Sequence, residues 1–273
     1  MKRIVKLEVI MANAMKNMDK NDKFFVAKLP LEYLDVAPNQ RDRISKAGID
    51  KKAKKWDNGK CGALKGTWHY GDQKVLLQDG QHRFLAAKRA ISEYGKEIDG
   101  LFVLVYPNLS HDEEIDLFLY QDEGVNKLRY CDKFKSILMK QHRNETEQAM
   151  FSLMQICDRR GILLQGYNNK NISTTKKIGS IKKSYEIIQN QGIECFDWIV
   201  DILEGSKCDY LQGAWNGCFL KTLASFYKKE DANETKYSLI ELLKFKKPSE
   251  LCKDARWNEA LFRKAIEDYT DLV

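Results

Sequence analysis

The first half of the chain is patterned as short apolar runs separated by Gly, Pro, Asn and Asp. Three of these runs predict strands, and they cover residues 24–29, 75–78 and 101–106. Apolar residues at helical spacing between and after them predict helices over residues 43–56, 83–94 and 112–120. Ser110 is the expected N-cap of the last helix, because acidic residues fill the turn that follows it.

The pattern changes near residues 128–131. Beyond this point strand signals nearly vanish, and apolar residues recur at helical spacing to the end of the chain. We therefore predict an α+β protein with two domains. A small mixed α/β domain spans residues 1–130, and an all-helical domain spans residues 131–273.

Composition narrows the class without fixing the function. Of the 273 residues, 43% are hydrophobic and 31% are charged, and the net charge is +7. This charge favours an anionic partner only where lysines cluster. No apolar run approaches the ~20 residues of a membrane span, and we expect a cytoplasmic protein without a membrane partner. The seven cysteines lack a CxxC pair, as is typical of reduced, mostly buried thiols.

The most informative segment is the string Asp79-Gly80-Gln81-His82-Arg83, which follows a predicted strand and opens a predicted helix. Asp-Gly favours a tight turn with positive φ. The first N–H groups of the helix lack helical partners and, with the helix dipole, favour an anion above the turn. Arg83 lies in the first turn, where its guanidinium can fork onto phosphate oxygens. The string therefore predicts a phosphate site.

The other side chains of this string allow several roles. His82 can contact phosphate or transfer a proton. Asp79 can orient His82, accept from a sugar hydroxyl or hold a metal ion, and Gln81 offers a donor and an acceptor. The alternative is a simple Asp-Gly turn that caps a surface helix.

The string resembles the DGQHR variant of the ParB/sulfiredoxin-like superfamily, including the phage and plasmid ParB-like nuclease-domain proteins. In that superfamily the matching turn is a phosphate-binding loop. The resemblance implies that Gly80, Gln81 and Arg83 hold phosphate. Sulfiredoxins carry a reactive Cys where this chain has Gln81, which excludes sulfiredoxin chemistry.

The flanking segments extend the resemblance over roughly residues 25–140. Residues 29–34 followed by Asn39-Gln40-Arg41 are similar to an opening strand and a "YQR"-like segment, with Asn39 in place of the usual aromatic residue. On the ParB-like hypothesis, Gln40 or Arg41 contacts the base or sugar side of a nucleotide.

Two basic clusters and one acidic cluster provide further candidates. Lysines 46, 51, 52, 54 and 55 beside Trp56 can follow a nucleic-acid backbone or form a solvated helix face. Lysines 176, 177, 182 and 183 follow a Ser/Thr triplet that can bind phosphate or cap a helix. Acidic residues gather over residues 112–123, where Asp122 is the candidate metal ligand.

Three hypotheses remain open. In the first, a phage or mobile-element ParB-like protein binds a nucleotide (ATP or CTP) or DNA phosphates at the DGQHR string. In the second, a nucleotide hydrolase, nuclease or phosphotransferase uses the same site, with His82 as acid/base and Asp79 or Asp122 serving Mg²⁺. In the third, a protein-interaction module carries a vestigial site. A homodimer and a host protein target are the partners that these hypotheses leave open.

Overall fold

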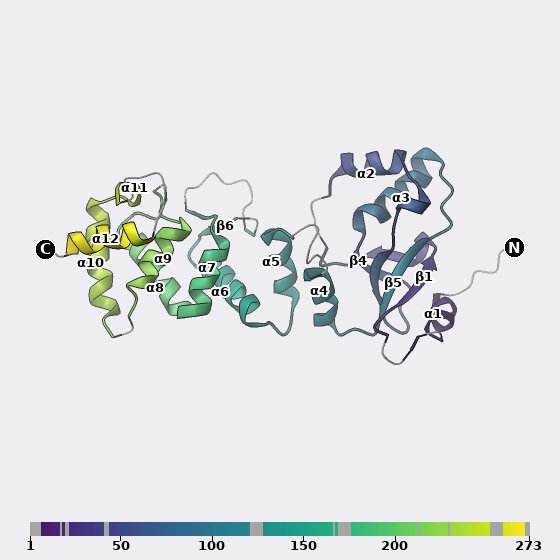
Figure 1. The fold of residues 1–273 in the computed structure, drawn as a ribbon, viewed down its shortest axis with the longest axis horizontal. Helices are drawn as coiled ribbons and strands as arrows, with labels where there is room; N and C mark the ends of the chain where they lie inside the picture. The colour runs from purple at the N-terminus through teal and green to yellow at the C-terminus, as the bar shows by residue number, and fades with distance from the viewer. Residues whose placement is uncertain are drawn as a thin grey trace. The chain divides into compact units, whose positions relative to one another are not determined.

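The computed structural model describes residues 7–16, 18, 19, 22–40, 44–120, 128–165, 167, 168, 176–211, 213–228, 230–251 and 259–270. These residues form two compact units (Figure 1). Unit 1 comprises Met1–Leu128 with Met139–His142, and unit 2 comprises Arg129–Leu138 with Arg143–Val273. A sheet in unit 1 and a helical unit 2 confirm the α+β class. In the described part of the chain, no helix is long and apolar enough to cross a membrane.

Unit 1 is built on a five-stranded mixed sheet in the order β1-β5-β3-β4-β2. β1 pairs antiparallel with β5, β5 parallel with β3, β3 antiparallel with β4, and β4 parallel with β2. The strands are β1 Phe25–Leu29, β2 Leu34–Val36, β3 Leu64–Trp68, β4 Val75–Asp79 and β5 Leu101–Pro107. Three of the strands confirm the predicted ones, and β2 and β3 are additions.

Four α-helices and two short 3-10 turns complete the described part of unit 1: α1 Leu7–Met15, η1 Leu31–Tyr33, α2 Lys46–Lys54, η2 Asn58–Lys60, α3 Gln81–Tyr94 and α4 His111–Leu119. The predicted helices correspond to α2, α3 and α4. Ser110 accepts from the Glu113 amide, and Glu113 reaches back to the Ser110 amide, which confirms the predicted N-cap as a capping box.

The core of unit 1 lies between the sheet and two helices. Leu29, Leu77 and Val103 from the strands are fully buried together with Met11 of α1 and Phe84 of α3. A second, small-residue interface joins α2 to α3, in which the buried side chains are Ile49, Ala53, Ala86 and Ala90. Small residues let the two helices approach closely, and α2 is thereby held beside the helix that begins in the DGQHR string (Figure 1).

The described residues of unit 2 form helices and one short parallel strand pair, β6 with β7, which the helical periodicity did not indicate. Its core includes Phe196, Ile199, Phe219, Leu220 and Leu223, all fully buried. The elements are α5 Tyr130–Met139, α6 Glu145–Arg159, β6 Leu163–Leu164, β7 Lys177–Ile178, α7 Ile181–Gln191, α8 Ile193–Gly205, α9 Gly217–Ser225, α10 Ala232–Phe245, α11 Pro248–Leu251 and α12 Glu259–Thr270.

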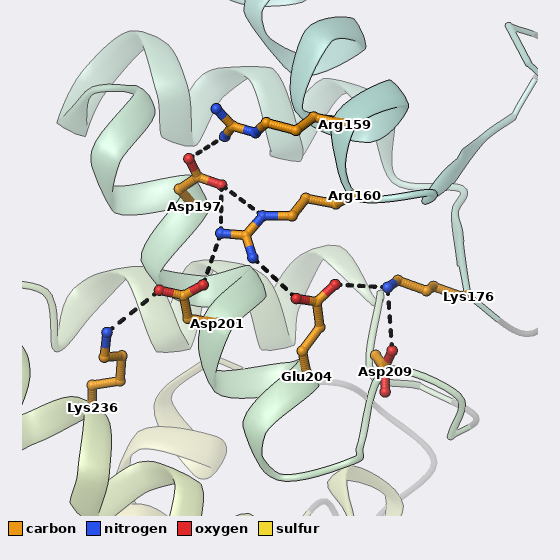
Figure 2. A network of polar contacts seen from close by, with 8 residues as sticks. All are labelled: Arg159, Arg160, Lys176, Asp197, Asp201, Glu204, Asp209 and Lys236. Carbon is orange, nitrogen blue, oxygen red and sulfur yellow. Dashed lines mark hydrogen bonds and ion pairs between the residues drawn. The ribbon is translucent and has the colours of Figure 1, made fainter.

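An ion-pair network fastens α8 to its surroundings in unit 2 (Figure 2). Arg160 bridges three acidic side chains of α8, at 3.1 Å from Asp197, 2.8 Å from Asp201 and 3.1 Å from Glu204. Lys176 bonds Glu204 at 2.7 Å. The remaining members are Arg159 on Asp197, Lys236 on Asp201 and Asp209 on Lys176. Four basic and four acidic side chains balance each other, so unit 2 holds these charges without a net excess.

Candidate functional site

The DGQHR loop, residues 79–83, lies where β4 ends and α3 begins. Gly80 is the N-cap of α3 and has φ 99° and ψ 12°, in the left-handed region. A Cβ at this position would lie 2.3 Å from Cδ2 of Leu64. Both the backbone angle and the close approach of Leu64 therefore require glycine, and the predicted strand–turn–helix is confirmed.

Arg83 fastens this loop to the segment that precedes β3. Its Nη1 donates to the carbonyl oxygens of Cys61 at 3.1 Å and Ala63 at 3.0 Å. Its Nη2 donates to Oδ2 of Asp79 at 2.8 Å. The side chain is 28% exposed. These three hydrogen bonds use some of the N–H donors of the guanidinium. Its other N–H donors are the ones that could bind a phosphate oxygen.

The other side chains of the loop take different environments. Asp79 is 41% exposed and accepts the Arg83 hydrogen bond. Its observed partner is thus Arg83, four residues along the same strand–helix junction. Gln81 is buried, and His82 is half-buried in the first turn of α3. The acid/base role of His82 and the metal or orienting role of Asp79 stay predictions.

Gln40 is brought to the same end of the sheet by a turn that follows β2. The Ala37 amide donates to the Leu77 carbonyl at 3.2 Å, and the Gln40 amide donates to the Ala37 carbonyl at 3.1 Å. The Gln40 side chain is buried and donates through Nε2 to the carbonyl of Gln78, the residue before Asp79. The structure therefore places Gln40 beside the loop, as a shared site requires. Arg41 and Asp122, the other predicted site residues, lie outside the described residues.

A lysine-rich pocket adjoins the loop through Arg83. This open pocket has a volume of about 460 Å³. Its lining residues are Gly48, Lys51, Lys52, Lys55, Trp56, Asp57, Lys60, Cys61 and Arg83. Five of them carry a positive charge and one carries a negative charge. We call it the lysine pocket.

Two of these cations already contact acids or carbonyls, and three do not. Lys60 lies 3.5 Å from Asp57, and Arg83 is held as described above. Lys51, Lys52 and Lys55 are exposed, and no ion pair of theirs is found within the described part of the chain. Lys51 and Lys52 lie in the last turn of α2, and Lys55 is its C-cap residue. Lys55 is three and four residues from the other two, a spacing that brings side chains to the same side of a helix end. The pocket can therefore offer uncompensated positive charge to an anion.

The pKa of the Cys61 thiol is shifted by burial and by the charges of this pocket. Burial raises the pKa of the thiol, and the positive charges of Arg83 and Lys52 act in the opposite direction. Burial outweighs the two cations, so the neutral thiol is favoured over the thiolate.

Sequence reasoning identified part of the pocket and missed the rest. The basic run on α2 was recognised, and the choice between a nucleic-acid face and a solvated face was open. Lys60 and the link to Arg83 were not recognised, because they depend on how η2 packs against α3. The signal in the sequence was the group of lysines around Trp56. That signal alone does not show a pocket, because the lining residues come from separate segments of the fold.

The second basic cluster has a different outcome. Lys176 is 11% exposed and belongs to the ion-pair network of unit 2. Lys182 lies 3.7 Å from Glu186, and Lys183 donates to Sγ of Cys218 at 3.0 Å. The Ser/Thr triplet at 173–175 lies outside the described residues. The described lysines of this cluster are thus largely matched by partners inside unit 2.

No group of three or more His, Cys, Asp or Glu side chains that could hold a metal ion is present among the described residues. The acidic residues at the start of α4 have structural partners instead. Asp112 accepts from the backbone amides of Gln141 and His142 at 2.8 and 2.6 Å. Glu114 contacts Nε2 of His69 at 2.9 Å.

Comparisons with known proteins give only a weak structural likeness. No family model matches the chain, and no curated protein matches it. Among solved structures it is similar to the C-terminally truncated chromosome-partitioning protein ParB from Caulobacter crescentus complexed with CTP-γ-S. The identity is 12%, the match covers 77% of this chain and 98% of that one, and the TM-score is 0.32. At this TM-score the likeness carries no conclusion about function.

Proposed function

We propose that the protein binds the phosphates of a nucleotide or of DNA at the DGQHR loop and the adjoining lysine pocket. The lysine pocket is the observation that carries the proposal. It places Lys51, Lys52 and Lys55, which lack ion-pair partners among the described residues, around the same cavity as Arg83. Cations that converge without acidic partners favour a multiply charged anion over a neutral ligand.

The loop adds a second anion-binding element to the pocket. Gly80 begins α3 in the left-handed conformation, and the first amides of a helix favour negative charge. Part of the Arg83 guanidinium remains to form charge-assisted hydrogen bonds. A ligand with several phosphates can therefore contact the helix start and the lysines together. We include in the proposal the ParB-like, mobile-element identity that the DGQHR string suggests.

The DGQHR loop also supports a second candidate function, phosphoryl-transfer chemistry. Asp79 directly precedes Gly80, and His82 follows it by two residues. For this function we assign proton transfer to His82 and metal binding to Asp79. Phosphate release from a bound nucleotide with Mg²⁺, lost in His82→Ala, would favour this function over simple binding.

A thermal-shift titration tests the binding proposal. The ligands are ATP, CTP, GTP, their diphosphates and inorganic tripolyphosphate, each with and without Mg²⁺. A ligand that binds only the folded protein stabilises it by about 2.7 kcal/mol at 100 times its Kd. We expect tripolyphosphate and at least one nucleotide to raise the melting temperature.

The variant with Lys51→Ala, Lys52→Ala and Lys55→Ala is expected to lose most of this shift. A matched control replaces Lys228, Lys246 and Lys247 by Ala, which are exposed lysines of unit 2. The control removes the same amount of charge at positions remote in sequence from the lysine pocket, and it should keep the rise in melting temperature. Absence of any shift in the unmodified protein would contradict the proposal and favour an interaction module with a vestigial site.

A further inference from the structure

Two buried carboxamides beside the DGQHR loop carry side-chain atoms that have no hydrogen-bond partner among the described residues. Asn39 is 3% exposed and Gln78 is 1% exposed. Within the described part of the chain, Nδ2 and Oδ1 of Asn39 and Oε1 of Gln78 make no hydrogen bond. Buried polar side chains in folded proteins almost always have partners, so each exception calls for a reason.

The backbone positions both residues next to the phosphate loop. β3 and β4 pair Lys65 with Asp79 and Gly66 with Leu77, which leaves Gln78 as the extra residue of a β-bulge. Bulges redirect a side chain and are frequent beside functional sites. Gln78 then immediately precedes the loop, and its own Nε2 makes only a long contact of 3.4 Å with Oγ1 of Thr67.

Asn39 lies in the turn of residues 37–40, which contacts the end of β4. This turn is fastened to β4 by the Ala37 amide on the Leu77 carbonyl and by the Gln40 side chain on the Gln78 carbonyl. Asn39 itself contributes no side-chain hydrogen bond to this arrangement. Its carboxamide can therefore turn toward a ligand without breaking a hydrogen bond, which gives the buried group a route to become paired.

Phosphate alone cannot satisfy the three unpaired atoms. Phosphate oxygens are acceptors, and two of the three unpaired atoms are carboxamide oxygens, which need a donor. The Asn39 amide also offers N–H donors that need an acceptor. The edge of a nucleobase presents donors and acceptors side by side, and Asn and Gln pair with such edges through two hydrogen bonds.

We propose that Asn39 and Gln78 select the base of the ligand whose phosphates occupy the DGQHR loop and the lysine pocket. This inference rests on the proposed function and assigns the base end of the same site. Asn39 supplies a donor and an acceptor, and Gln78 supplies an acceptor through Oε1. The base belongs either to a free nucleotide or to a nucleotide within a DNA strand.

Binding of tripolyphosphate, the four ribonucleoside triphosphates and four short homopolymeric DNA strands to the unmodified chain tests the inference. The comparison variants are Asn39→Leu and Gln78→Leu, which keep a similar volume and remove the carboxamide. Asn190→Leu, at an exposed position on α7, is the matched control. We expect a base preference of about tenfold, reduced to about twofold in Asn39→Leu and Gln78→Leu and retained in the control. A base preference among the triphosphates indicates that the site binds a free nucleotide, and a preference among the DNA strands indicates that it binds a nucleotide within DNA.

Free-state stability provides a second readout. Replacing an unpaired buried carboxamide by an apolar side chain should raise the melting temperature of ligand-free Asn39→Leu. Equal binding of all bases by the unmodified chain, or a preference that survives both substitutions, would overturn the inference. In that outcome tripolyphosphate still binds and the proposed function stands. Failure of tripolyphosphate and of every nucleotide and strand to bind would overturn both.

Discussion

Arg83 and Asp79 form an ion pair at 2.8 Å across the start of α3, while Arg83 also holds the carbonyls of Cys61 and Ala63. The pair partly cancels the positive charge of Arg83 at the DGQHR loop. The positive field of the lysine pocket therefore depends mainly on the lysines of α2. Asp79 positions Arg83 and at the same time opposes an approaching anion.

Asp79→Asn is expected to tighten anion binding. The variant keeps an oxygen that accepts from Arg83 and removes the negative charge. Because Asp79 is 41% exposed, solvent screens its effect, and we expect tripolyphosphate to bind about two- to fivefold more tightly. Isothermal titration at low salt measures the change. Asp99→Asn, at an exposed ion pair with Lys28, is the control. Weaker binding in Asp79→Asn would contradict this prediction and show that the positioning of Arg83 outweighs the lost repulsion.

Gly80→Ala is expected to destabilise unit 1. The substitution strains a φ of 99° and forces Leu64 to move, because the new Cβ would lie 2.3 Å from its Cδ2. We expect a loss of about 2–4 kcal/mol in the free energy of unfolding, measured with urea. Gly95→Ala is the control, since its φ is also positive and no atom lies within 4 Å of the added Cβ. It should lose about 1–2 kcal/mol from backbone strain alone. Equal losses would contradict the role of Leu64.

The elements with strong local signals could be predicted from the sequence. α3 begins at a glycine turn, and α4 begins with a capping box of Ser110 and Glu113. The start of each helix is therefore encoded by a few neighbouring residues. β2 and β3 were missed for a physical reason. β2 has three residues, and β3 contains Gly66, whose missing side chain admits Val75 at close range. β2 owes its conformation to pairing with β4, and β3 owes its conformation to pairing with β4 and β5, and not to local preference.

The candidate site divides in the same way. The strand–turn–helix of residues 79–83 is local, and sequence patterning predicted it. Gln40 was named as a site residue by the family resemblance and not by the pattern, and the structure places it beside the loop. The ion pair of Arg83 and the lysine pocket arise where η2, α2 and α3 meet, so no local pattern contains them. The bulge at Gln78 is likewise a property of strand register. Contacts between distant segments therefore account for what sequence reasoning missed.

Arg160→Ala is expected to weaken unit 2. The change leaves Asp197, Asp201 and Glu204 with fewer cations, and Figure 2 shows that Arg160 lies between all three. Since Arg160 is 27% exposed, we expect a loss of about 1–2 kcal/mol, less than for a fully buried ion pair. Arg159→Ala, at a side chain 58% exposed that contacts only Asp197 in the network, should lose less than about 1 kcal/mol. Urea unfolding measures both, and a larger loss in Arg159→Ala would contradict this ranking.

The phenol of Tyr167 is expected to lose its proton at a higher pH than an ordinary tyrosine. Burial, together with its hydrogen bond to Asp158, raises its pKa to about 12 from the usual 10. A raised folded-state pKa favours the protonated phenol, so its stabilising contribution is complete below pH 10 and is lost as the pH rises toward about 12. The phenolate absorbance of Tyr167→Phe, subtracted from that of the unmodified chain, isolates this titration. Asp158→Asn should lower the midpoint, and a midpoint near 10 in the unmodified chain would contradict the prediction.

The lysine pocket predicts a specific salt dependence of DNA binding. Each phosphate neutralised by a lysine releases counterions, and the slope of log K against log salt falls by about 0.9 per contact on duplex DNA. If Lys51, Lys52 and Lys55 contact phosphates, replacing all three by Ala should make the slope shallower by about 2–3. Fluorescence anisotropy with a labelled duplex at several salt concentrations measures the slope.

The control for this measurement removes the same charge elsewhere. Substituting Lys228, Lys246 and Lys247 by Ala changes the net charge equally, so it reproduces any effect of overall electrostatic attraction. A slope reduced only in the α2 variant places phosphate contacts at the lysine pocket. A slope reduced equally in both variants would mean that net charge governs the binding. An unchanged slope in both would remove the α2 lysines from DNA contact and leave the pocket to a free nucleotide.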